Sequence, residues 1–131
     1  MNVLIADDDR VTATLIAGRL KASGYQTTMA FDAMQALMMV MRTAPDVVLL
    51  DVNMPGGNGV QALQRIKANS KTTHIPVIVL TGSTDPQLPA KVREMGAADF
   101  LQKPVDFQKL EALLSQLTGQ APEQPAKGTA S

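Results

Sequence analysis

The chain has 131 residues, of which 45% are hydrophobic, so it is long enough for one domain with a buried core and too short for two. Its 12 basic and 12 acidic residues cancel, which argues against a general nucleic-acid or membrane surface. Cysteine is absent and histidine occurs once, which excludes disulfides and Cys- or His-rich metal sites. No apolar run approaches the about 18 residues of a membrane-spanning helix, and we expect a cytoplasmic protein.

Short apolar runs predict five strands. In chain order they lie at 2–6, 25–30, 46–51, 75–81 and 99–102. The third and fourth runs are apolar at consecutive positions, which is typical of strands that are buried on both faces of a parallel sheet.

Helical patterns separate the strands. The first is expected to place Val11, Leu15 and Ile16 on one face, and the methionines of 34–41 are expected to fill the core and the helix face. A weaker segment near 87–95 contains Pro89, which a helix tolerates only in its first turn. The clearest apolar stripe consists of Phe107, Leu110, Leu113, Leu114 and Leu117.

The order βαβαβαβαβα predicts an α/β fold, a doubly wound five-stranded parallel sheet with helices on both faces. We assign residues 1–118 to this domain. The small, polar, Pro-containing segment 119–131 is expected to be a disordered tail or a linker.

Polar side chains follow four of the predicted strands. Acidic residues 7–9 come after the first strand, the third ends in Asp51, the fourth ends in Thr81, and Lys103 follows the fifth. In an open parallel sheet, ligands bind outside the carboxyl ends of the strands. We therefore expect these side chains to converge at one edge.

The chemistry of this edge points to phosphoryl transfer. Several clustered carboxylates repel one another unless a cation lies among them, and Mg²⁺ prefers oxygen ligands. A hydroxyl (Thr81) and an ammonium (Lys103) suit the surroundings of a phosphoryl group. Since cysteine is absent and the single histidine is not placed there, a carboxylate is the candidate nucleophile.

Four stretches carry a family resemblance: "VLIADDD", "VVLLDVNMPGGNG", "VIVLTGS" and "GAADFLQKPV". Their order and spacing resemble those of the CheY-like receiver domain of two-component response regulators. The resemblance covers residues 1–118 and implies the flavodoxin-like (βα)5 fold.

The resemblance implies roles for the acidic residues. Asp51 corresponds to the phosphoacceptor. Asp8, Asp51 and the backbone carbonyl of Asn53 correspond to the ligands of Mg²⁺ (or Mn²⁺), and Asp7 would reach the ion through water. Asn53 and Ser83 stand at positions that tune the lifetime of the phosphoryl group in such proteins.

The resemblance also implies how the signal would be formed. Thr81 would bond a phosphoryl oxygen, Lys103 would pair with the phosphoryl group or with Asp51, and Thr81 and Phe100 correspond to the switch pair. The bond between Lys103 and Pro104 is expected to be cis.

The implied partners are a sensor histidine kinase or histidine phosphotransfer protein and an output protein or effector domain that binds the 87–118 face. We expect no direct contact with nucleic acid or membrane, and a monomer or a phosphorylation-promoted dimer. The domain would catalyse only its own phosphorylation and dephosphorylation and would not be an enzyme acting on an external metabolite.

Two alternatives remain open. "DDDRV" also fits the D-x-D-x-[TV] motif of haloacid-dehalogenase-like phosphatases, in which Asp7 would be the nucleophile and Asp9 the general acid–base. Against this alternative, Asp51 stands where that family needs no acid, and Asp9 precedes a helical pattern, where we expect it to be the N-cap of the helix. The second alternative is a pseudo-receiver, a binding module that keeps the fold without phosphorylation.

Overall fold

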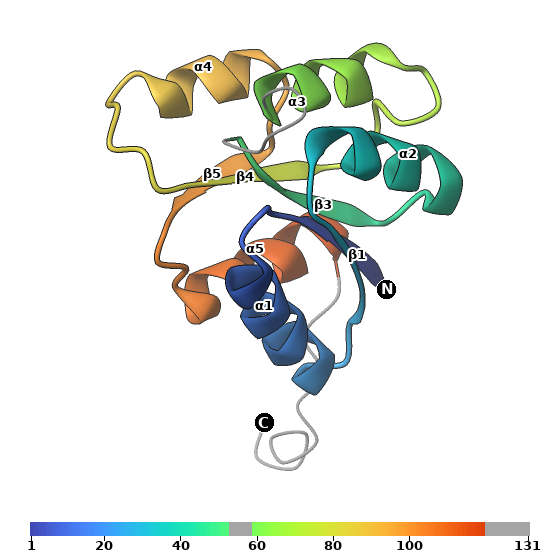
Figure 1. The fold of residues 1–131 in the computed structure, drawn as a ribbon, viewed down its shortest axis with the longest axis vertical. Coiled ribbons are helices and arrows are strands. Elements are labelled where there is room, and N and C mark those ends of the chain that lie inside the picture. The colour runs from blue at the N-terminus through green and yellow to red at the C-terminus, as the bar shows by residue number, and fades with distance from the viewer. Residues whose placement is uncertain (53–58, 120–131) are drawn as a thin grey trace.

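The computed structural model describes residues 1–52 and 59–119, so most of the predicted tail lies outside the described residues. These residues form one parallel sheet with helices on both faces (Figure 1). The strands are β1 (Asn2–Ala6), β2 (Gln26–Ala30), β3 (Val47–Asp51), β4 (Val77–Thr81) and β5 (Asp99–Gln102). The helices are α1 (Arg10–Ala22), α2 (Ala33–Thr43), α3 (Gly59–Ala68), α4 (Leu88–Glu94) and α5 (Phe107–Thr118).

The strand order is β2-β1-β3-β4-β5, which confirms the predicted doubly wound sheet. Each strand lies within two residues of its predicted range. The chain reverses its direction of winding between the neighbouring strands β1 and β3, where the register pairs Ala6 with Leu50. Such a switch point is where open α/β sheets bind their ligands.

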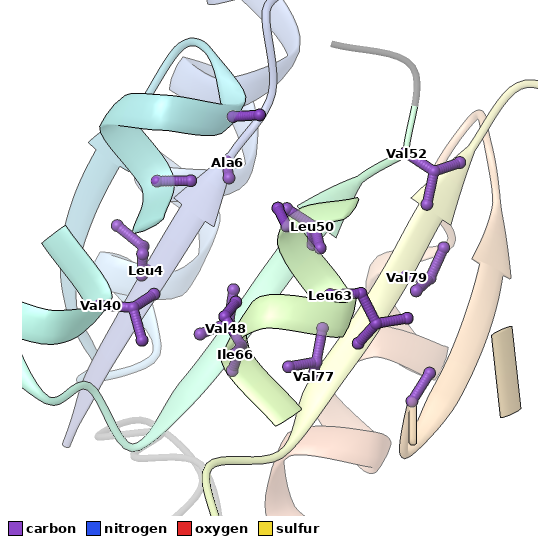
Figure 2. Close-up of a cluster of buried hydrophobic side chains, with 14 of the residues drawn as sticks. Leu4, Ala6, Val40, Val48, Leu50, Val52, Leu63, Ile66, Val77 and Val79 are labelled. Atoms are coloured by element: carbon purple, nitrogen blue, oxygen red, sulfur yellow. The ribbon is translucent and has the colours of Figure 1, made fainter. Parts of the chain in front are cut away.

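Two apolar clusters, one on each face of the sheet, form the core. Helices α2, α3 and α4 cover one cluster, and Figure 2 shows Val40, Leu63 and Ile66 of this face beside the strand residues Val48 and Val77. Helices α1 and α5 cover the other cluster. Because both faces are covered, every residue of β3 and β4 is buried, which explains their consecutive apolar pattern.

Three helices begin at an aspartate cap. The side chain of Asp9 accepts hydrogen bonds at the start of α1, and Asp32 and Asp106 do so for α2 and α5. The N-cap residue of α4 is Gln87, whose side chain makes no cap hydrogen bond. Pro89 lies in the first turn of α4, as predicted.

The predicted face of α1 is wrong. Val11 is 68% exposed and Leu15 is 62% exposed, whereas Ile16 is buried. The buried face also contains the small residues Ala13 and Ala17, which let the helix lie close to the sheet. Periodicity gives most weight to large side chains, so it missed a face that is built partly from alanine.

The expectation for the methionines of α2 is also largely wrong. Met39 packs against the core, but Met34, Met38 and Met41 are about half exposed. The buried side of α2 uses alanine and valine instead, which leaves its methionines on the outer surface. Within the described ranges, no helix has both the length and the apolar character needed to cross a membrane.

Candidate functional site

The site lies at the carboxyl edge of the sheet, beside the switch point. Asp51 is the last residue of β3, and Asp7 directly follows β1, so the pairing of Ala6 with Leu50 brings the two acids side by side. Carboxylate oxygens of Asp7, Asp8 and Asp51 all lie within 4.8 Å of one another. Asp7 and Asp51 are buried, with 0% and 3% exposure, whereas Asp8 faces solvent. The structure therefore brings Asp51 together with two acids, Asp7 and Asp8, that lie far from it in the sequence.

Lys103 supplies the positive charge at this edge. Its Nζ lies 2.6 Å from Oδ2 of Asp7 and 3.3 Å from Oδ2 of Asp51. The backbone holds the residue in place, since its N–H donates to the carbonyl oxygen of Thr81 at 2.7 Å and its bond to Pro104 is cis. Burial alone would lower the pKa of Lys103, but the close contact with the Asp7 carboxylate and the charge of Asp51 outweigh it and raise the pKa.

One buried oxygen at the site is poorly satisfied. Oδ1 of Asp7 accepts the N–H of Asp9 at 2.9 Å. Oδ2 of Asp7 has the close ion pair with Lys103 but accepts no hydrogen bond of standard geometry from the described residues. Three carboxylates against one ammonium also leave two negative charges uncompensated when all are ionised. A divalent cation with oxygen ligands would remove both deficits, so these residues fit Mg²⁺.

Thr81 lies at the same edge, at the end of β4. The strand register pairs Asp51 with Leu80, the residue before Thr81, and Thr81 itself is fully buried. Its hydroxyl oxygen accepts the N–H of Ser83 at 3.0 Å, which ties the start of the next loop to the strand. Gln102 of β5 donates to the carbonyl oxygen of Ser83 at 3.3 Å. A change at Thr81 is thus mechanically connected to the segment that leads into α4.

Phe100 does not point into the carboxylate group. It is half-buried and packs against the cluster beneath α2, α3 and α4. The register pairs it with Val79, two residues before Thr81 on β4. Phe100 therefore lies close to the carboxyl edge of the sheet, on the face that α2, α3 and α4 cover.

Asp9 has a different partner set from the other two acids of its triplet. Its carboxylate accepts the N–H groups of Val11 and Thr12 and the hydroxyl of Thr12. The hydroxyl of Thr12 is the main cause that lowers the pKa of Asp9. Asp9 is not part of the carboxylate group formed by Asp7, Asp8 and Asp51. This cap geometry removes support from the phosphatase alternative, which needs Asp9 as an acid–base at the reacting centre.

Two further residues concern the loop after β3. Asn53, which the sequence analysis singled out, lies outside the described residues. Gly59, which it missed, donates its N–H to the carbonyl oxygen of Val52 at 3.0 Å. A Cβ at Gly59 would collide with the backbone of Asp51 and Val52. Only glycine lets α3 begin so close to Asp51, and its place at the end of the quoted stretch "VVLLDVNMPGGNG" was the available signal.

Known proteins are similar to this chain in sequence and in fold. The family described as "Response regulator receiver domain" matches residues 3–115. The response regulator PleD of Caulobacter vibrioides is 37% identical over 116 residues, which cover 88% of this chain and 26% of PleD. The phosphate regulon regulator PhoB of Pseudomonas aeruginosa is 33% identical, over 86% of this chain and 49% of that protein. The chain thus spans between a quarter and a half of the length of these two relatives.

Solved structures agree. The signal receiver domain of a DNA-binding response regulator (merR) from Colwellia psychrerythraea superimposes with a TM-score of 0.86 at 30% identity, over 92% of this chain and 99% of that one. A Francisella response regulator receiver domain gives a TM-score of 0.84 at 29% identity, over 90% and 96% of the two chains. Together with the family match over residues 3–115, these findings show that the chain belongs to the receiver domain family of two-component response regulators, with the CheY-like fold.

Proposed function

We propose that the domain is a phosphorylation switch in which Asp51 accepts a phosphoryl group from a phosphohistidine of a sensor kinase or phosphotransfer protein in the cytoplasm. The observation that carries this proposal is the position of Asp51. It is a buried carboxylate that ends β3, faces Lys103 at 3.3 Å and lies within 4.8 Å of two further acids. A nucleophile and its charge-stabilising groups are thereby held in one place.

Asp7, Asp8 and Asp51 would hold a Mg²⁺ or Mn²⁺ ion, with the backbone carbonyl of Asn53 as a further ligand and Asp7 bound through water. Oxygen-only ligands and the excess negative charge support this assignment. When bound, the ion neutralises negative charge on the oxygens of the transferring phosphoryl group.

In the transfer, a carboxylate oxygen of Asp51 attacks phosphorus, and the bond between phosphorus and the imidazole nitrogen breaks. The nitrogen keeps the electron pair and takes a proton from solvent. Lys103, already an ion-pair partner of Asp51, neutralises charge on the phosphoryl oxygens. In autodephosphorylation, water attacks the same phosphorus, the bond to the Asp51 oxygen breaks, and inorganic phosphate leaves. The domain so acts on its own acyl phosphate and on no external metabolite.

The signal would pass through Thr81. A phosphoryl group on Asp51 offers acceptor oxygens to its hydroxyl, and a shift of that hydroxyl competes with the bond from Ser83. The change would reach Phe100 and the 87–118 face, made of α4, β5 and α5, where an output protein or effector domain binds. Ser83 and Asn53, which stand two positions after Thr81 and Asp51 in the sequence, would set the lifetime of the phosphoryl group. This signalling suits a monomer or a phosphorylation-promoted dimer.

Intact-mass measurement after incubation with Mg²⁺ and a phosphoramidate tests the proposal. We expect the wild-type chain to gain one labile phosphoryl group, and Asp51→Asn to gain none. Label that persists in Asp51→Asn and disappears in Asp7→Asn would contradict the proposal and favour a phosphatase-like site. A folded wild-type chain that binds Mg²⁺ but takes no label from either acetyl phosphate or a cognate phosphohistidine would instead be a pseudo-receiver.

A further inference from the structure

The outer surface of α2 carries an apolar stripe that the core does not use. Met34, Met38 and Met41 follow one another at spacings of four and three, so they lie on one side of the helix. Their exposed fractions are 56%, 53% and 48%. Three adjacent half-exposed apolar side chains on one helix are more than the isolated surface methionine that every protein shows.

These methionines line a shallow groove between α2 and α3. The groove has a volume of about 410 Å³, and its walls consist of the three methionines, Leu37, Arg42 and Arg65. Figure 1 shows the two helices side by side on the same face of the sheet. At one end, the side-chain amide of Asn69 donates to the sulfur of Met41 at 3.5 Å. We name this surface, defined by those six wall residues, the methionine groove.

The charged side chains on the two helices that form the methionine groove all have the same sign. The charged side chains of α2 and α3 are Arg42, Arg65 and Lys67, and neither helix contains an acid. Lys67 is already engaged, because its Nζ donates to the backbone carbonyls of two residues after α3. Arg42 and Arg65 are exposed, and neither forms an ion pair with any described residue. The groove thus combines an apolar floor with two uncompensated positive charges.

We infer that the methionine groove binds an acidic amphipathic helix of a partner protein. Apolar side chains of that helix would lie on the methionines, whose unbranched thioethers adapt to varied shapes. Its flanking carboxylates would pair with Arg42 and Arg65, in the mode by which amphipathic helices occupy apolar grooves. This surface belongs to α2 and α3, apart from the 87–118 face, and the inference does not depend on phosphorylation of Asp51.

Charge argues against two other occupants of the methionine groove. A second copy of the chain would have to present the same groove to itself, since dimers of identical chains are usually two-fold symmetric, and would bring arginine against arginine. Residues 120–131 of the chain contain one glutamate and one lysine, so that segment carries no net charge to complement the groove.

The test uses the chain labelled at its eight methionine methyl groups and titrated, by NMR, with a synthetic amphipathic peptide of about 18 residues, five helical turns, that carries leucine on one face and glutamate beside it. We expect the methyl signals of Met34, Met38 and Met41 to shift saturably, with a dissociation constant below about 1 mM. The signals of Met39 and Met95, which pack against the core, serve as internal references and stay in place.

Matched variants isolate the charge. Arg42→Gln combined with Arg65→Gln should weaken binding about three- to tenfold, because each exposed ion pair contributes modestly. Lys21→Gln combined with Lys109→Gln removes the same charge from exposed positions on α1 and α5 and should leave binding unchanged. The inference is overturned if the glutamate peptide causes no shift at millimolar concentration, or if a lysine version binds as well. Methyl shifts that depend on protein concentration alone, with a dimer in sedimentation, would assign the groove to a second copy and equally overturn it.

Discussion

Helix α4 is anchored very differently from helices α1 and α5, which cover the opposite face of the sheet. Helices α1 and α5 have 13 and 12 residues, and each begins at an aspartate that accepts two backbone N–H groups. Helix α4 has seven residues, makes no side-chain cap hydrogen bond, and buries only Val92. Helices α1 and α5 are therefore firmly anchored to their face of the sheet, whereas α4 is held by few interactions.

The difference indicates where a signal is free to act. The segment between Thr81 and α4 is held by short local bonds, such as those from the N–H of Asp85 to Ser83 Oγ at 3.2 Å and from the N–H of Gln87 to Asp85 Oδ1 at 2.9 Å. Regions with few buried contacts open at a lower free energy than the core. A small change at Thr81 is thus connected to the weakly anchored helix α4, while Asp51 ends the fully buried strand β3.

The largest expected effects come from shortening a buried side chain in α1 and, for comparison, one in α4. Leu20→Ala in α1 should cost about 2–5 kcal/mol of unfolding free energy in urea denaturation. Val92→Ala in α4 should cost only about 1–2 kcal/mol, at about 0.8 kcal/mol for each buried methyl-sized group. Amide exchange should accelerate throughout the chain in the first variant and mainly within α4 in the second. An equal, global loss in both variants would refute the comparison.

Magnesium should stabilise the sheet and leave the local stability of α4 unchanged. Binding at Asp7, Asp8 and Asp51 joins β1 to β3, so Mg²⁺ at about 100 times its dissociation constant should add about 2.7 kcal/mol. We expect the melting temperature to rise and exchange from the strands to slow, while local exchange from α4 stays unchanged.

Two isosteric variants provide the control for that experiment. Asp8→Asn should lose the gain from Mg²⁺, whereas Asp9→Asn should keep it, since asparagine also caps helices and Asp9 is not part of the carboxylate group. The assignment of the ion fails if both variants respond to Mg²⁺ as the wild type does.

Helix caps offer a smaller and more local test. Asp106→Ala removes two hydrogen bonds at the start of α5 and should cost about 1 kcal/mol in denaturation experiments. Gln87→Ala should stay within about 0.5 kcal/mol, because the side chain of Gln87 makes no cap bond. A cost of Gln87→Ala that matched that of Asp106→Ala would show α4 to be as firmly capped as α5.

The smallest effect concerns Lys67 of α3, whose Nζ donates to the carbonyl oxygens of Thr73 and Ile75. Burial lowers the pKa of Lys67 below 10.5. The unfolded chain therefore holds this proton to higher pH than the folded chain, and the contribution of Lys67 to stability rises with pH between the folded pKa and 10.5. Denaturation at several alkaline pH values should show wild type gaining stability relative to Lys67→Met, and a constant difference would contradict the burial of this amine.

Much of the fold followed from local pattern. Short apolar runs located all five strands, and the consecutive apolar positions of β3 and β4 correctly indicated strands that are covered on both faces. The convergence of Asp51, Thr81 and Lys103 was also predictable, since parallel strands bring their carboxyl ends to one edge. Pattern failed where burial depends on small residues, as in α1, and where long apolar side chains lie outside the core, as on α2.

The sequence by itself determined the order of the elements and which residue types gather at the carboxyl edge, because both depend on periodicity and on the direction of the strands. Only the tertiary structure decided the burial and the partners of the three adjacent acids: Asp7 is buried against Lys103, Asp8 faces solvent, and Asp9 accepts the first N–H groups of α1. Adjacent residues share one local pattern, but their burial and partners depend on register and packing with strands and loops far away in the chain.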